Sequence, residues 1–233
     1  MYLIRSARVD DPAALRRQPE LWRRVRRFNL PVQLAVAAGE EVAMAAEDPA
    51  RAALVSLAPA RSGSPELFDA IRSLDMSAPH ANPVVTLHAV DNLALSALAI
   101  TLGNQAYGLG LGGGAGQGWV ALEVAWERLA DGRESEALVM AGDQNGESGL
   151  AVALLFARDP ALYPPLGKTV RLAAVKRESG TEREFEVEPH AAAGLAALLA
   201  ALGKVSGAGQ WTYRVPAGHG DGRDCPELVW EVT

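Results

Sequence analysis

Apolar and polar positions along this chain follow two periods, and the switches between them predict the order of its elements. Strands are predicted by alternation or by short apolar runs at Tyr2–Val9, Ala53–Leu57, Tyr107–Leu111, Ala137–Ala141, Leu150–Phe156, Thr169–Lys176, Thr181–Val187, Trp211–Val215 and Glu227–Val232. Helices are predicted by apolar residues three and four apart at Ala13–Phe28, Val32–Ala46, Pro65–Leu74, Asp91–Leu102, Val120–Leu129 and Ala191–Leu202. Strands that alternate with helices in this way are typical of an α/β fold.

One stretch, Tyr107–Asp143, combines a strand, a tight turn, a helix and a second strand. Its first apolar run enters a glycine cluster, which consists of Gly112, Gly113, Gly114, Gly116 and Gly118. In an α/β fold a sharp turn from strand to helix exposes one side chain beside free N–H groups and the positive end of the helix dipole. The turn is therefore the place where a nucleophile would be expected.

Composition limits the classes of protein that need to be considered. With 233 residues, 49% of them hydrophobic and 21% charged, the chain can bury a substantial core. It has no charge-free apolar run of about 18 residues and no signal-peptide pattern at its amino end, so we expect a cytoplasmic protein without a membrane partner. The single Cys225 permits no internal disulfide and no cysteine-based metal site, and its setting suggests an incidental thiol.

Positive charge is concentrated near the amino end, although the net charge is −6. Eight arginines in the first 27 residues face only Asp10, Asp11 and Glu20. This basic segment could receive an acidic partner, or its arginines could form ion pairs within the chain. We expect no nucleic-acid partner, because no helix-turn-helix, zinc or aromatic-basic signature accompanies the arginines.

Several segments resemble the β-ketoacyl synthases of the thiolase superfamily. The stretch AYGLGLGGGAGQGWVALEVAWERL resembles their nucleophile turn and the helix behind it. LPVQLAVAAGEEVAMAA after Arg27-Phe28, DPARAALVSLA, NPVVTLHAVDNLALSALAITLGNQAYG and GLAVALLFARDPAL resemble further family segments, in the same order, over about residues 20–175. Aligning VALEVAWERL with the family's helix puts Ala115 where the nucleophilic cysteine would stand.

The resemblance implies an α/β fold with two parts. Residues 1–168 would form one thiolase-like half, a five-stranded mixed sheet with helices on both faces. Residues 169–233 would form a short α+β extension of a hairpin, a helix ended by Gly203 and two strands, packed on the same domain. This extension is too short for the second half of a synthase. Its segment EPHAAAGLAALLAAL resembles the helix that follows a catalytic histidine, but the alignment puts Glu188 at that position rather than His190.

The resemblance also implies a catalytically silent subunit, similar to the small chain-length-factor-like proteins of bacterial type II fatty acid, polyketide or aryl-polyene clusters. Decarboxylative condensation needs a thiolate and usually two histidines, whereas alanine cannot carry an acyl group. Gln117 could be a relic or a substitute, since glutamine replaces the cysteine in some synthase relatives. We expect substrate contacts from Asn92, Gly113, Gly114, Gly116 and Gln117, and no cofactor.

The same resemblance places the strand before the turn at a dimer interface. Leu109 and Leu111 belong to a run without the lysine, proline or charge that protects an exposed edge. We therefore expect a homodimer, or a heterodimer with a β-ketoacyl synthase. An acyl carrier protein, which is acidic, would be the partner expected for Arg23, Arg24, Arg26 and Arg27.

Other interpretations remain open at this stage. One is a thiolase-superfamily acyl transferase or decarboxylase that works without cysteine. Another is nucleotide binding at a GxGxxA pattern, although Gly110 lies 33 residues before Asp143 instead of about 20. Asp143, Asn145 and Glu147 could ligate a cation, but a polar turn explains them equally well, so we expect no metal. The histidines His80, His88, His190 and His219 are best explained as structural residues.

Overall fold

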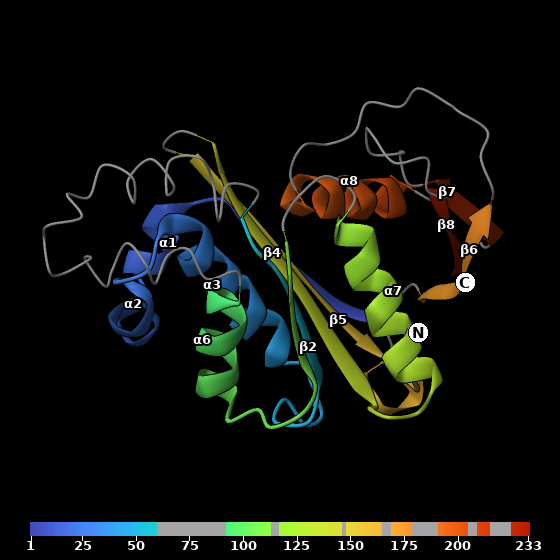
Figure 1. The fold of residues 1–233 in the computed structure, drawn as a ribbon, viewed down its shortest axis with the longest axis horizontal. Coiled ribbons are helices and arrows are strands. Elements are labelled where there is room, and N and C mark those ends of the chain that lie inside the picture. The colour runs from blue at the N-terminus through green and yellow to red at the C-terminus, as the bar shows by residue number, and fades with distance from the viewer. Residues whose placement is uncertain are drawn as a thin grey trace, which may run out of the picture.

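The chain forms one mixed β-sheet flanked by helices on both faces (Figure 1). The computed structural model describes residues 1–59, 92–112, 117–145, 148–164, 169–178, 191–204, 209–214 and 225–233. The strands are β1 (Tyr2–Val9), β2 (Ala53–Leu57), β3 (Gly108–Leu111), β4 (Glu136–Asn145), β5 (Ser148–Ala157), β6 (Val170–Glu178), β7 (Gly209–Arg214) and β8 (Cys225–Val232). The helices are α1 (Pro12–Arg16), α2 (Pro19–Val25), α3 (Leu30–Ala43), α6 (Leu93–Leu102), α7 (Gln117–Ala130), α8 (Ala191–Lys204) and the short 3₁₀ helix η1 (Pro160–Leu162).

The strand order is β3-β2-β4-β5-β1-β6-β8-β7. Its first five strands form the predicted five-stranded mixed sheet, in which β2 is parallel to β3 and β4 while β5 is antiparallel to β4 and β1. The three strands of the C-terminal segment continue the same sheet beyond β1. The predicted fold class is thus confirmed, and the extension lengthens the sheet.

The two faces of the sheet carry different helices. Figure 1 shows α1, α2, α3 and α6 on one face and α7 and α8 on the other. Because neighbouring residues of a strand point to opposite faces, Leu54 belongs to the core under α3 and α6, and Val55 belongs to the core under α7 and α8. Strand β5 is buried between β4 and β1 with both faces covered, which explains its continuous apolar run.

Helix boundaries differ from the sequence prediction mainly at prolines. The single predicted helix Ala13–Phe28 is wrong, because Pro19 starts a new helix and holds Gln18 at φ −113° and ψ 86°. The predicted start at Val32 is also wrong: Pro31 lies in the first turn of α3, and the Asn29 side chain caps that helix by accepting a hydrogen bond from the Val32 N–H at 3.3 Å.

Two further predicted element boundaries, nearer the C-terminus, are also wrong. Helix α8 continues through Gly203 to Lys204, and β4 runs to Asn145, so the predicted turn Gly142–Ser148 is shorter than expected. The predicted helix Pro65–Leu74 and strand Thr181–Val187 lie outside the described residues. None of the helices in the described part of the chain is long and apolar enough to span a bilayer.

Candidate functional site

The carboxyl ends of β2, β3 and β4 lie together at one end of the sheet, since these three strands are parallel. Strand β3 ends at Leu111 and α7 begins at Gln117, so the predicted order of strand, turn and helix is confirmed on both sides of the turn. Gly113, Gly114, Ala115 and Gly116 lie outside the described residues, and their predicted roles stay predictions. The same holds for His80, His88, His190, His219, Glu147 and Glu188.

The first turns of α7 and α8 lie side by side at this carboxyl end of the strands. A Cβ placed on Gly118 would lie 3.5 Å from Leu195 Cγ and 3.6 Å from the Ala191 carbonyl oxygen. Gln117, half-buried, is therefore held one residue from the contact between the two helices. A Cβ at position 118 would make ordinary van der Waals contacts with α8, whereas a larger side chain would meet that helix.

Asp143 fixes α8 in place. Its side chain is 5% exposed, and its Oδ2 accepts a hydrogen bond of 2.9 Å from the Ala192 N–H in the first turn of the helix. A carboxylate in that position satisfies a free N–H and complements the helix dipole. Sequence analysis considered Asp143 only as a cation ligand or turn residue and missed this role. Among the described residues no cluster of three or more metal-ligating side chains occurs.

Asn92 lies directly against β3. A Cβ placed on Gly110 would lie 2.9 Å from Asn92 Cβ and 3.2 Å from its Cα, so only glycine fits there. Asn92 occupies the N-cap position of α6, yet its side chain is exposed and makes no capping hydrogen bond. The fold thus brings Asn92 and Gln117 to the same end of the sheet as the turn, while their contact with substrate stays a prediction.

Strand β3 is the edge of the sheet, as predicted. The Leu54 N–H bonds the Tyr107 carbonyl and the Ala58 N–H bonds the Leu111 carbonyl, both at 2.8 Å. By the alternation of a strand, Gly108 and Gly110 then direct their N–H and C=O groups away from β2. In the described part of the chain no strand pairs with that side. Leu111 packs against the core, whereas Leu109 is half-buried and is not part of it.

The arginines near the amino end are partly paired within the chain. Arg23 lies 2.9 Å from Glu20, and Arg24 lies 2.8 Å from Glu40. Burial raises the pKa of the Glu40 carboxyl above its ordinary value, although Arg24 acts in the opposite direction. Arg26 is exposed and forms no ion pair with another described residue. Arg23 and Arg24 thus already have intramolecular partners, and for all four arginines, Arg27 included, contact with a partner stays a prediction.

Comparison with known proteins defines the fold class. No family model matches the sequence, and no curated protein matches it. Among solved structures, a ketosynthase in complex with its chain length factor from Xenorhabdus doucetiae matches with a TM-score of 0.54 and 17% identity, over 88% of this chain and 79% of that chain. Cerulenin-bound Xanthomonas campestri OleA matches with a TM-score of 0.51 and 9% identity, over 99% of this chain and 97% of that chain.

A third match is weaker. The ishigamide ketosynthase/chain length factor gives a TM-score of 0.48 and 18% identity, over 66% of this chain and 51% of that chain. The first two matches show that the chain has the thiolase-like α/β fold of the β-ketoacyl synthases and chain length factors, as the sequence resemblance implied.

Proposed function

We propose that this protein is a catalytically silent, chain-length-factor-like subunit that acts by pairing with a β-ketoacyl synthase or with a second copy of itself. In this proposal residues 1–168 supply the synthase-like half and residues 169–233 extend its sheet. The observation that carries the proposal is the position of β3 at the edge of a thiolase-like sheet, with no strand of the described residues paired on its outer side. The matched Xenorhabdus protein is itself a ketosynthase in complex with its chain length factor.

The residue at the nucleophile position of the turn supports the proposal that the protein is catalytically silent. Ala115 stands where the resemblance puts the nucleophile, and an alanine side chain has no atom that can bond an acyl group. The remaining thiol, Cys225, begins β8 in the part of the sheet farthest from β3. A substrate held near Asn92 and Gln117 would therefore meet no cysteine of this chain.

The edge of β3 supports pairing. Its outward backbone groups belong to Gly108 and Gly110, which have no side chain to hinder a second strand. An apolar edge strand without protective residues is a site for strand addition. A stable pair would bury at least about 1,000 Å². For an acidic acyl carrier protein, we propose Arg26 as a contact, since Arg23 and Arg24 are engaged within the chain.

Intact-mass spectrometry after incubation with malonyl-CoA and with malonyl-acyl carrier protein tests whether the protein is catalytically silent. We expect no acyl adduct and no release of carbon dioxide by the protein alone, because no nucleophile is present in the turn. An adduct that supports condensation, or decarboxylation without a synthase, would contradict the proposal and favour the cysteine-independent transferase or decarboxylase. The Cys225→Ser variant is the control, since a chemically labelled incidental thiol would disappear in it without any change in turnover.

A further inference from the structure

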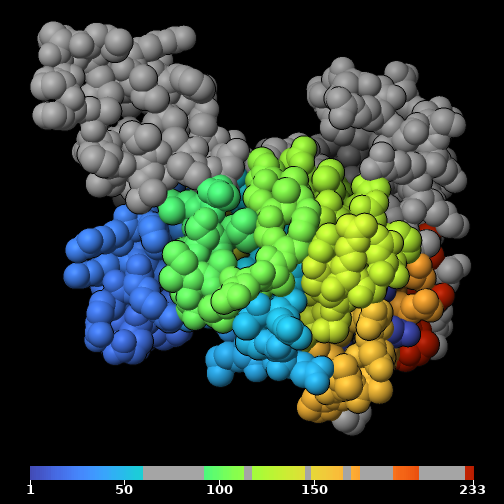
Figure 2. All heavy atoms as spheres, turned by 60° about the horizontal axis from the view of Figure 1, so that its bottom comes forward, coloured from blue at the N-terminus to red at the C-terminus, as the bar shows by residue number. Residues whose placement is uncertain are grey.

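A polar cavity lies at the opposite end of the parallel strands. Its volume is about 450 Å³, and it is lined by the loops that lead into β2 (Ala50, Arg51), β3 (Gln105, Ala106) and β4 (Arg133, Glu134, Ser135). Figure 2 shows this end of the molecule, where the cyan, green and yellow-green atoms of these loops lie side by side. The volume falls within the usual range of small-molecule sites.

The loops around this cavity are held rigidly. Asn104 Nδ2 donates hydrogen bonds of 2.8 Å to the carbonyls of Pro49 and Ala52, and its Oδ1 accepts one of 3.1 Å from the Ala106 N–H. The Gln105 N–H bonds the Ala50 carbonyl at 3.1 Å. The loops before β2 and β3 are thus joined to each other, and these two walls of the cavity are preorganised.

Residues with donor groups line the cavity on three sides. Arg51 lies in the first loop, Gln105 in the second, and Arg133 and Ser135 in the third, and all four residues are exposed. Arginine and hydroxyl donors are the groups that proteins use for phosphate oxygens. Donors on three sides suit the oxygens of a tetrahedral group better than those of a planar carboxylate.

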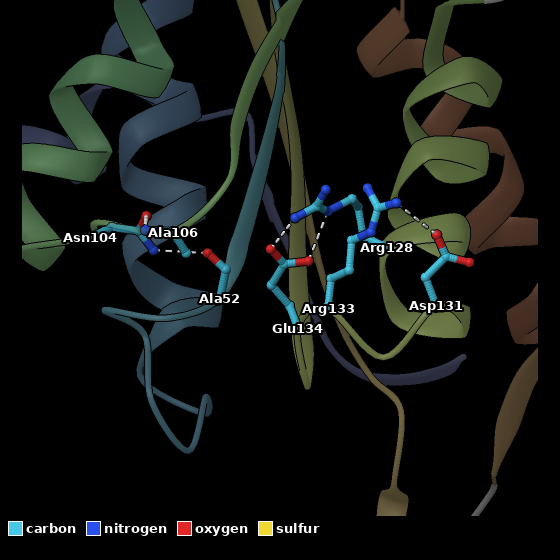
Figure 3. A network of polar contacts seen from close by, with 7 residues as sticks. All are labelled: Ala52, Asn104, Ala106, Arg128, Asp131, Arg133 and Glu134. Atoms are coloured by element: carbon cyan, nitrogen blue, oxygen red, sulfur yellow. Dashed lines mark hydrogen bonds and ion pairs between the residues drawn. The ribbon is translucent and has the colours of Figure 1, made fainter.

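The cavity lining has two arginines, Arg51 and Arg133, whose positive charges are available to an anionic ligand. Glu134 is bound through both oxygens by Arg128, whose guanidinium also lies 4.1 Å from the centre of the Tyr107 ring. Arg133 has only a 3.5 Å contact with the exposed Asp131 (Figure 3), a pair that a ligand can replace at little cost. Arg51 forms no ion pair with another described residue, although the exposed Asp48 lies three positions before it.

We propose that this cavity binds a small molecule through a phosphate group, with Arg51 and Arg133 as its charged ligands. The group would sit among the three loops, and the remaining volume would hold a small organic body. The site is separate from the turn at the carboxyl ends and does not depend on the proposed pairing function.

Calorimetric titration of the full chain with inorganic phosphate at low ionic strength tests this proposal, with chloride and acetate at matched ionic strength as reference anions. We expect saturable phosphate binding, weaker acetate binding and no heat with chloride. A phosphomonoester such as glycerol phosphate should bind more tightly than inorganic phosphate, because the cavity is larger than the ion. Equal binding of acetate and phosphate, or no saturable phosphate binding, would overturn the proposal.

The double variant Arg51→Gln/Arg133→Gln should lower phosphate affinity about tenfold or more, since each charge-assisted hydrogen bond contributes substantially. Both side chains are exposed, so the variant should fold. The matched control, Arg8→Gln/Arg17→Gln, removes the same charge from exposed positions that do not line the cavity and should keep wild-type affinity. Retained binding in the first variant, or an equal loss in the control, would overturn the proposal.

Discussion

The two ends of the parallel strands β2, β3 and β4 are built differently. At the amino ends, buried or clamped polar side chains hold the loops: Glu136 accepts hydrogen bonds from the N–H groups of Glu47 and Asp48 at 2.8 and 3.0 Å and also binds the Tyr163 hydroxyl. At the carboxyl ends, the contacts are close approaches of backbone at glycines such as Gly110 and Gly142. Asn92 at that end is exposed and does not cap its helix.

This difference distinguishes polar residues that stabilise the fold from polar residues that are free to bind a ligand or a partner. The buried and half-buried polar side chains at the amino ends, such as Glu136 and Asn104, have internal partners that explain them. At the carboxyl ends, Asp143 has such a partner, whereas the Asn92 side chain is exposed and makes no capping hydrogen bond. We therefore expect substitution of Glu136 or Asn104 to affect stability, and substitution of exposed polar residues, at either end, to affect binding.

The largest effect is expected at Gly142. A Cβ there would lie 2.3 Å from the Pro31 carbonyl oxygen and 3.0 Å from Ala35 Cβ, so Gly142→Ala would force α3 away from the sheet. We expect a loss of about 3 kcal/mol or more in the free energy of unfolding, measured by urea denaturation. Gly112→Ala is the control, since a Cβ there meets nothing within 4 Å. Equal stability of both variants would show that backbone approach does not hold this end together.

Glu136→Gln tests the polar contacts of the amino ends. The Glu136 carboxylate is 1% exposed and accepts two backbone N–H groups, and an amide would turn a donor toward one of them. We expect a loss of about 2 kcal/mol in the free energy of unfolding, again by denaturant titration. The same change at the exposed Glu127 on α7 should have little effect. A tolerated Glu136→Gln would remove the distinction between the two ends.

Asn104→Ala and Asn92→Ala compare the same side chain at the two ends. Asn104 makes three hydrogen bonds to backbone groups, so its loss should cost about 1–2 kcal/mol of stability. Loss of the exposed Asn92 side chain should change stability by less than about 0.5 kcal/mol. Thermal unfolding of the two variants checks this. A loss of stability for Asn92→Ala as large as that for Asn104→Ala would mean that Asn92 is a structural residue.

Tyr163→Phe should have a smaller effect than Glu136→Gln and a defined pH dependence. Burial and the hydrogen bond to Glu136 raise the pKa of the Tyr163 hydroxyl above its ordinary value of 10.0. The unfolded chain therefore loses this proton first, and the stabilising contribution falls as pH rises above about 10. The variant should be less stable by about 1 kcal/mol at pH 7, and the difference should shrink above pH 10. A constant difference in denaturation midpoint across this range would contradict the assignment.

Local patterns predicted most of the fold, because burial leaves a direct trace in the sequence. The apolar run of β5 and the unprotected edge of β3 could be read from a few adjacent residues each. Pro19 also carried a usable signal for the break between α1 and α2, which the predicted long helix ignored. The hydrogen bond between Asp143 and Ala192 joins residues 49 positions apart, so no local sequence pattern predicts it. The cavity between Arg51, Gln105 and Arg133 likewise arises only from the strand order.

The central claim, pairing across β3, is tested most directly by the molar mass in solution of three proteins. Gly108→Pro removes an outward N–H on an edge strand, where proline is tolerated, and Gly108→Ala keeps it, with ordinary contacts of 3.6 Å to Leu95. By light scattering, alone or mixed with a β-ketoacyl synthase, the wild type and Gly108→Ala should form a dimer containing the 24.5 kDa chain, and Gly108→Pro should be a folded monomer. A wild-type monomer under both conditions, or an unchanged dimer of Gly108→Pro, would contradict the claim.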